Sequence, residues 1–419
     1  MFPTHVETAV DIGRVGSVFA RALEPMLLGD DMAFVVTFRD KYDPERLWSA
    51  YESMVRENPG LQVILQPSGQ SLAWAPIDSS DLDKALDCQR QHFTRTFSFE
   101  ELLSPVHALT PPLPVRISRL GEREVCFQMS HALSNGRGGV YWIICWIAAA
   151  NGQSVPPGPT TGRFDSIAPR SGLALLPLYL LNFRARAGRK ATDNTVDLTH
   201  GKTPIPHKNG YASRTYLFSE AQTSRVLDKA RGLDLSLQQY MCLVVAEAML
   251  SAQPEKSRVC ILVPTDIARY LPELPRSVPG NYTGTMVVQV RRGAPLESQI
   301  ARQFRWLRRG VDYWSTRLIA ATSPEEGLLK KLTQTAALPF HRRGPFQNVS
   351  CAVSNVGVVT APAEWGVESG YGTTKTQTVF FTIAVLSGCL SANVTFARDL
   401  YDPEEVFRVA DAALADLDC

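Results

Sequence analysis

The 419-residue sequence lacks an excess of charge of one sign, since 43 Lys and Arg residues stand against 41 Asp and Glu residues. This balance gives no reason to expect a nucleic-acid partner. Long hydrophobic runs are also missing. The longest, residues 140–150 and 173–181, fall short of the about 20 residues that cross a bilayer. We therefore expect neither nucleic-acid binding nor a transmembrane segment.

The N-terminus has no basic region followed by an apolar core, which excludes a secretory signal peptide of the usual kind. The eight cysteines include no Cys-x-x-Cys pair, and several lie in apolar strand or helix patterns. Buried free thiols in a reducing compartment explain this better than disulfides or zinc. The expected protein is cytoplasmic and, as the default, a monomer.

Common catalytic fingerprints are absent as well. The sequence has no Gly-x-Ser-x-Gly, Walker or dinucleotide-binding motif, and its other histidines have no metal-ligand spacing. The run from Gly136 to Gly139 lacks the Lys-Ser/Thr ending of a phosphate-binding loop. We expect no bound cofactor and no metal.

What the sequence does contain is a distinctive stretch from Ser130 to Gly139. Before it, residues 124–129 alternate between apolar and polar, as in a strand, and after it residues 140–150 are almost wholly apolar, as in a buried helix. His131 thus lies where a strand gives way to a glycine-rich turn. Such a turn can hold an imidazole at the mouth of a pocket, although a loop or core histidine with purely structural partners fits the same pattern.

The stretch resembles the His-x-x-x-Asp-Gly signature of the acyltransferase superfamily. That superfamily includes chloramphenicol acetyltransferase, the plant acyl-CoA alcohol acyltransferases (BAHD enzymes), alcohol acetyltransferases and peptide-synthetase condensation domains. His131 and Gly136 match the signature, and Asn135 replaces its Asp. Ser130 stands where condensation domains usually carry another histidine.

Three later segments add to the resemblance, and their order and spacing agree with it. Residues 263–269 are similar to a strand end that carries a structural arginine, here Arg269. Residues 280–282 resemble the Gly-Asn turn that follows, and residues 354–357 resemble the Ser-Asn-x-Gly of alcohol acetyltransferases.

The resemblance implies an α/β fold of two related chloramphenicol-acetyltransferase-like lobes, each a mixed β-sheet with helices, around a central channel. Residues 1–165 would form the N-terminal lobe, 166–211 a crossover linker and 212–419 the C-terminal lobe. An internal match supports related lobes, since residues 37–45 and 395–404 both lead a strand into a helix that opens with Asp-Pro-Glu. The crossover contains four basic residues, Arg184, Arg186, Arg189 and Lys190. Either these residues contact an anionic donor, or the segment is a solvated linker.

The resemblance also implies a reaction. An acyl group would move from a coenzyme A or carrier-protein thioester to a hydroxyl or amine of a small specialised metabolite, with His131 as general base. Asn135, Gly136 and Arg269 would support the motif, with Arg269 taking the place of the arginine that pairs with the motif Asp. The residues expected to contact substrate are Ser130, Asn281, Tyr282, Ser354 and Asn355.

Asn135 leaves two outcomes open. The turn keeps its shape and acyl transfer with a weaker support, or the pocket has left acyl transfer for another task. In the second case the same fold would act as a cyclase of a biosynthetic intermediate, or would bind a small molecule without turnover.

Overall fold

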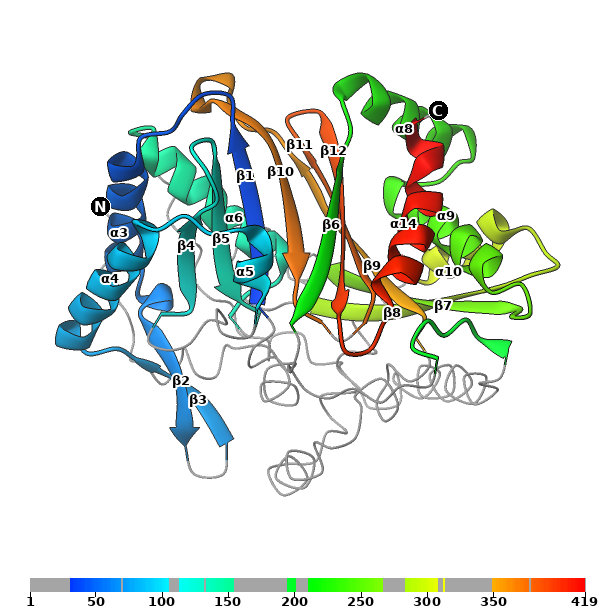
Figure 1. The fold of residues 1–419 in the computed structure, drawn as a ribbon, viewed down its shortest axis with the longest axis horizontal. Coiled ribbons are helices and arrows are strands. Elements are labelled where there is room, and N and C mark those ends of the chain that lie inside the picture. The colour runs from blue at the N-terminus through cyan, green and yellow to red at the C-terminus, as the bar shows by residue number, and fades with distance from the viewer. Residues whose placement is uncertain are drawn as a thin grey trace, which may run out of the picture.

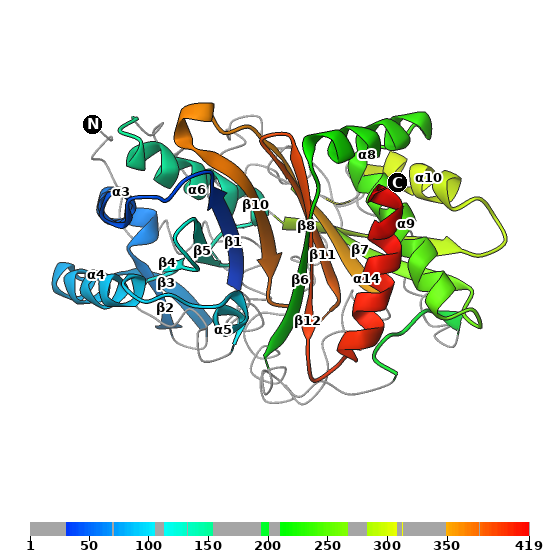
Figure 2. The same cartoon turned by 45° about the horizontal axis from the view of Figure 1, so that its top comes forward.

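Two lobes, each a β-sheet with its main layer of helices on one side, make up the described part of the chain, and the short helix α5 (Phe99–Leu103) packs on the other face of the N-terminal sheet (Figure 1). The computed structural model describes residues 31–68, 71–104, 113–131, 133–153, 194–200, 210–266, 283–307, 312, 349–376 and 378–418. Seen from a second direction, the helices of the two lobes still lie on opposite outer sides, with the sheets between them (Figure 2).

The N-terminal lobe is built on a four-stranded sheet with the order β10-β1-β5-β4. Its strands are β1 (Asp31–Phe38), β4 (Val115–Arg119), β5 (Glu124–Ser130) and β10 (Val367–Thr374). Its helices are α3 (Pro44–Glu57), α4 (Ser79–Phe93), α5 (Phe99–Leu103) and α6 (Gly136–Ala150), with a 3-10 turn η1 (Pro59–Leu61). A separate hairpin consists of β2 (Val63–Ser68) and β3 (Ser71–Pro76).

Buried hydrogen bonds and apolar packing fix the helical layer of this lobe on its sheet. The indole of Trp146 on α6 donates to the carbonyl of Leu47 on α3 at 2.8 Å. The hydroxyl of Tyr51 donates to the carbonyl of Val115 on β4 at 3.0 Å. Phe127 of β5 packs into the same core. These contacts hold α3 and α6 against the sheet in which β5 lies between β1 and β4.

The C-terminal lobe is built on a six-stranded sheet with the order β6-β12-β11-β9-β7-β8. Its strands are β6 (Tyr211–Leu217), β7 (Arg258–Asp266), β8 (Thr283–Arg291), β9 (Cys351–Val359), β11 (Phe380–Leu386) and β12 (Cys389–Ala397). Its helices are α8 (Glu220–Gly232), α9 (Leu237–Ala252), α10 (Leu296–Leu307) and α14 (Pro403–Asp418), and a 3-10 turn η7 (Ala363–Trp365) precedes β10.

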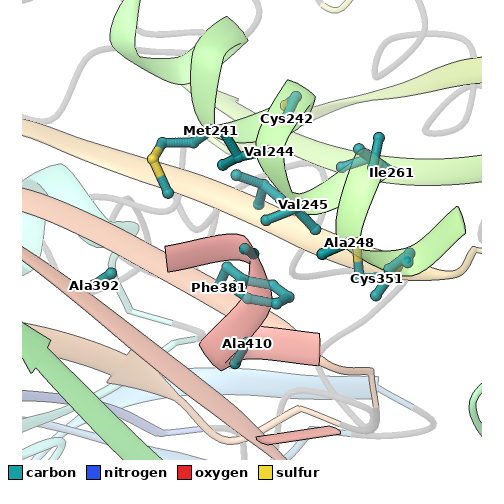
Figure 3. Close-up of a cluster of buried hydrophobic side chains, with 14 of the residues drawn as sticks. Met241, Cys242, Val244, Val245, Ala248, Ile261, Cys351, Phe381, Ala392 and Ala410 are labelled. Atoms are coloured by element: carbon teal, nitrogen blue, oxygen red, sulfur yellow. The ribbon is translucent and has the colours of Figure 1, made fainter. Parts of the chain in front are cut away.

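Helix α9 forms the centre of the second core. Its apolar side chains meet Phe381 of the sheet and Ala410 of α14, and the group also includes Ile261 and Cys351 (Figure 3). Within the described residues no single helix is long and apolar enough to cross a membrane. α8 and α9 pass that test only as a pair bent by 89°, and α9 is almost entirely buried in this core.

Strand β10 joins the two lobes, because it follows β9 in the chain but pairs antiparallel with β1 of the N-terminal sheet. Two glycines allow its close approach. A Cβ added at Gly370 would lie 2.7 Å from the carbonyl oxygen of Val35 and 2.8 Å from Cδ2 of Leu386. At Gly372 it would lie 3.0 Å from the ring of Phe34. The sequence pattern had not indicated this strand, since a Gly-rich octapeptide has low β-propensity.

The structure confirms the two-lobed α/β fold. It also shows that the two matched segments occupy equivalent positions, each between a strand and a helix. β1 leads into α3, with Asp43 accepting hydrogen bonds as N-cap and Pro44 as the first helical residue, and β12 leads into α14, which begins at Pro403. A mixed sheet was expected in each lobe, and in the C-terminal lobe β9 runs parallel to β11 and β7. The described strands of the N-terminal sheet pair antiparallel throughout, because β4 and β5 form a hairpin and β1 and β10 run against their neighbours.

Replacing Gly370 with Ala should lower the free energy of unfolding by about 1–3 kcal/mol, because the added methyl overlaps a backbone oxygen that cannot turn aside. The matched control is Gly121→Ala, where the added Cβ meets nothing within 4 Å. Urea unfolding followed by tryptophan fluorescence measures both. Equal stability of the two variants would contradict the close approach of β10 to β1.

Candidate active site

His131 directly follows β5, and a hydrogen bond to Ser134 orients its ring. The Nδ1–H donates to the backbone carbonyl oxygen of Ser134 at 3.0 Å. A carbonyl oxygen can only accept, so this contact requires the proton on Nδ1 and leaves the lone pair of the neutral ring on Nε2. The ring is therefore held in the tautomer in which Nε2 can take a proton.

The environment of His131 also keeps the ring neutral. Burial lowers its pKa below the ordinary value of 6.5, and this effect outweighs backbone hydrogen bonds and the negative charge of Asp31, which act in the opposite direction. Asp31 itself is paired, because its Oδ2 lies 3.4 Å from Nζ of Lys375, and both side chains are almost fully buried. At neutral pH the ring is thus an uncharged base.

Asn135 begins helix α6. It has extended backbone angles, and its Oδ1 accepts from the backbone N–H of Gly138 at 2.9 Å, as an N-cap does. The helix starts at Gly136, four residues earlier than the apolar run had indicated. The side chain that replaces the signature Asp therefore has a local structural role, because it satisfies the first turn of the helix that follows His131.

Two glycines of the first turn of α6 are required by close contacts. A Cβ at Gly138 would lie 2.1 Å from Oγ of Ser134, and a Cβ at Gly139 would lie 2.5 Å from Cε2 of Phe34 on β1. A Cβ at Gly136 would meet its nearest neighbour only at 3.8 Å. The glycine run thus serves helix packing against the loop and the sheet.

The Ser-Asn-x-Gly segment of the C-terminal lobe lies next to this loop. β9 carries a bulge at Val356, between Asn355 and Gly357, where its pairing with β11 shifts. Oδ1 of Asn355 accepts from the N–H of Gly357 at 2.9 Å, and Val356 packs into the N-terminal core beside Gly136. Two motifs more than 200 residues apart in the sequence therefore meet across the lobes, with Ser354 half-buried on the same strand.

An ion pair connects the lobes beside the motif. Nη1 of Arg137, in the first turn of α6, lies 3.0 Å from Oδ2 of Asp266 at the end of β7. Arg137 is partly exposed, so the pair contributes less than about 1 kcal/mol to stability. Its value is positional, because it holds the start of α6 against the end of a strand of the other lobe.

Three predicted site residues, Arg269, Asn281 and Tyr282, lie outside the described residues, as do the four basic residues of the crossover. Of the others, Ser130, His131, Asn135 and Gly136 lie at the end of β5 and the start of α6, and Ser354 and Asn355 precede Val356, the residue of β9 that lies beside Gly136. Sequence reasoning missed Asp31 and Lys375. No local pattern could reveal them, because they meet only through the β1–β10 pairing.

No family model and no curated protein matches the sequence. Solved structures do match, and the chain has the two-lobed fold shared by acetyltransferases and condensation domains.

Among particular proteins, the chain is similar to TRI3 trichothecene 15-O-acetyltransferase from Fusarium sporotrichioides, with 11% identity over 97% of this chain and 93% of that one and a TM-score of 0.65. Polyketide synthase associated protein 5 from Mycobacterium tuberculosis matches with 14% identity over 97% of both chains and a TM-score of 0.62. The starter condensation domain of rhizomide synthetase RzmA, in complex with C8-CoA and Leu-SNAC, matches with 12% identity over 97% and 92% and a TM-score of 0.57.

Substitution of Asn135 by Ala should lower the free energy of unfolding by about 1 kcal/mol, because the N–H of Gly138 loses its acceptor. Asn135→Asp keeps an oxygen at the N-cap, next to the positive end of the helix, and should retain most of the stability. Urea unfolding of both variants measures the difference. An Ala variant as stable as the wild type would contradict the capping role.

Proposed function

We propose that the protein is an acyltransferase that moves an acyl group from a coenzyme A or carrier-protein thioester to a hydroxyl or amine of a small specialised metabolite. The observation that carries the proposal is the ring of His131, held as a neutral Nδ1–H tautomer by Ser134 at the junction of the lobes. The fold class supports it, and the RzmA domain, which has this fold, was solved with C8-CoA.

In the proposed reaction Nε2 of His131 removes the proton from the acceptor hydroxyl or amine as that atom attacks the thioester carbonyl. A tetrahedral intermediate forms, the carbon–sulfur bond breaks, and the imidazolium returns the proton to the leaving sulfur, which releases a thiol and restores the neutral ring. The enzyme forms no covalent bond, because orientation of the two substrates by the surrounding groups supplies the remaining acceleration. Ser354 of β9 and Ser130 of β5 are the described hydroxyls of the predicted site that could contact substrate.

The roles of the supporting groups follow from their contacts. Asn135 and the glycines of α6 set the shape of the loop, and the Arg137–Asp266 pair holds that loop to the C-terminal lobe. We propose these as positioning groups, since none of them needs to exchange a proton with substrate. Arg269, Asn281 and Tyr282 keep the roles that the resemblance implies for them.

Replacing His131 with Ala should reduce thiol release from a panel of short- and long-chain acyl-CoA donors, given pooled hydroxylated acceptors, by about 100-fold to 10,000-fold, as expected for loss of a general base. The control is His200→Ala, a partly exposed histidine paired with Glu405 in the C-terminal lobe. Full turnover by the His131 variant would rule out its role as base.

The same experiments distinguish the acyltransferase from a cyclase and from a binding protein. If no free or carrier-bound thioester releases thiol, but a single substrate is converted to a cyclic product of the same elemental composition, the protein is a cyclase. Affinity for a small molecule without any turnover would show a binding protein.

The pH dependence of kcat/KM should follow His131. The base must be neutral, so the rate falls as the pH drops through the pKa of the ring, and burial holds that pKa below 6.5. The midpoint of the acid limb is therefore expected below pH 6.5, in a profile measured at saturating donor. An acid limb centred clearly above pH 6.5 would be inconsistent with the buried ring.

A further inference from the structure

A buried ion pair lies at the end of the N-terminal sheet from which the loop of His131 begins. Nζ of Lys375, the residue directly after β10, donates to Oδ2 of Asp31 at 3.4 Å, and both side chains are almost fully buried. The backbone N–H of Lys375 also donates to the carbonyl oxygen of Asp31 at 3.0 Å. Lys375 thus holds the first residue of β1 through both its side chain and its backbone.

The register of the sheet puts this pair next to the proposed base. Asp31 pairs with Ser130, the last residue of β5, and His131 follows Ser130 in the chain. Asp31 acts on the imidazole through its charge. Burial, the largest effect, lowers the pKa of the His131 ring, and the carboxylate of Asp31 raises it. A lysine that pairs with Asp31 therefore changes the charge that acts on His131.

Stability does not explain why a charged pair is kept in this place. Removal of two charges from water offsets most of their mutual attraction, and well-packed apolar side chains of similar size are often as stable. The cost is visible here, because burial lowers the pKa of Lys375 against the attraction of Asp31. The pair therefore indicates a role beyond packing.

A general base has two electrostatic requirements that oppose each other. It must be neutral before the reaction, and its protonated form must be stabilised while it holds the proton of the acceptor. A nearby carboxylate stabilises the imidazolium, but on its own it also favours a charged ring at neutral pH. A carboxylate paired with a cation meets both requirements, because the cation reduces its effect on the ring without removing it.

Other ionisable groups act on the pair from the neighbouring strands. Arg116 of β4 attracts Asp31 and repels Lys375, and its guanidinium stays charged over the pH range in which histidine titrates. Cys126 of β5 also acts on Lys375, but burial raises the pKa of its thiol to about 12, so the thiol is neutral in that range. Neither group changes its charge as His131 titrates.

We infer that Lys375 is a positioning residue for His131, which pairs with Asp31 to hold this carboxylate at the end of the sheet and to limit its effect on the imidazole. The role of His131 as base comes from the proposed function, and the inference rests on that function only for its effect on rate. The effect on the ring itself belongs to the folded protein and can be measured without substrate.

The test follows the titration of the His131 ring by NMR of protein labelled with 15N-histidine. In Lys375→Met the ring should titrate at a higher pH than in the wild type, because the carboxylate of Asp31 loses its cation. In Asp31→Asn the ring should titrate at a lower pH, because the attraction to the imidazolium is lost. In the double variant, Lys375→Met should shift the midpoint less than it does alone, since Lys375 acts through Asp31.

Two further variants keep the test decisive. Lys375→Gln can still donate a hydrogen bond to Asp31, so it makes the same comparison if Lys375→Met does not fold. Arg214→Gln is the control for net charge, because it breaks an exposed ion pair with Asp411 in the C-terminal lobe, and it should leave the titration unchanged. A merely structural role would lower stability without moving the midpoint in opposite directions in the Lys375 and Asp31 variants.

A folded Lys375→Met or Lys375→Gln variant whose ring titrates at the wild-type pH, or below it, would overturn the inference. If the midpoints move as expected, the acid limb of kcat/KM should move with them, up in Lys375→Met and down in Asp31→Asn. An acid limb that stays in place while the ring titration moves would contradict the proposed function, and the effect of Lys375 on the ring would stand.

Discussion

The pairing of β10 with β1 is the constraint on which the rest of this structure depends. A strand that belongs by sequence to the C-terminal half becomes the edge of the N-terminal sheet, and its glycines let it approach to van der Waals limits. The pairing of this strand with β1 connects the two lobes. It also places Lys375 beside Asp31. Asp31 pairs with Ser130, so both lie at the end of the sheet from which the loop of His131 begins.

The loop after β5 carries His131, the proposed base, on this frame. Its geometry needs no charge at position 135, because Asn135 caps α6 with a neutral oxygen and the cross-lobe ion pair is made two residues later by Arg137. An asparagine at this position is thus accommodated locally. The imidazole keeps the carbonyl partner that sets its tautomer, and the first turn of α6 keeps a satisfied N–H.

Much of the fold could be predicted where local patterns agree with tertiary structure. The capping boxes at Ser219 and Ser236 start α8 and α9, and Asp43-Pro44 starts α3, because these signals act within one turn of helix. β10 could not be predicted. Its residues Val367–Thr374 gain strand structure only from partners far away in the sequence.

The same distinction holds for the site. His131 and the Ser354–Gly357 segment were recognisable from their own residues, and the structure places Val356 of this segment beside Gly136, in the helix that follows His131. Asp31 and Lys375 lie in no recognisable motif, because they come together only through the pairing of β1 with β10. Residues of this kind are visible only once the sheet is assembled.

The most direct measurement of the central claim is the tautomer and titration of His131, by NMR of protein labelled with 15N-histidine and assigned with His131→Ala. The account predicts a neutral Nδ1–H ring at pH 7, with an unprotonated Nε2 that titrates below pH 6.5. A ring protonated on Nε2 alone, or charged at pH 7, would contradict it.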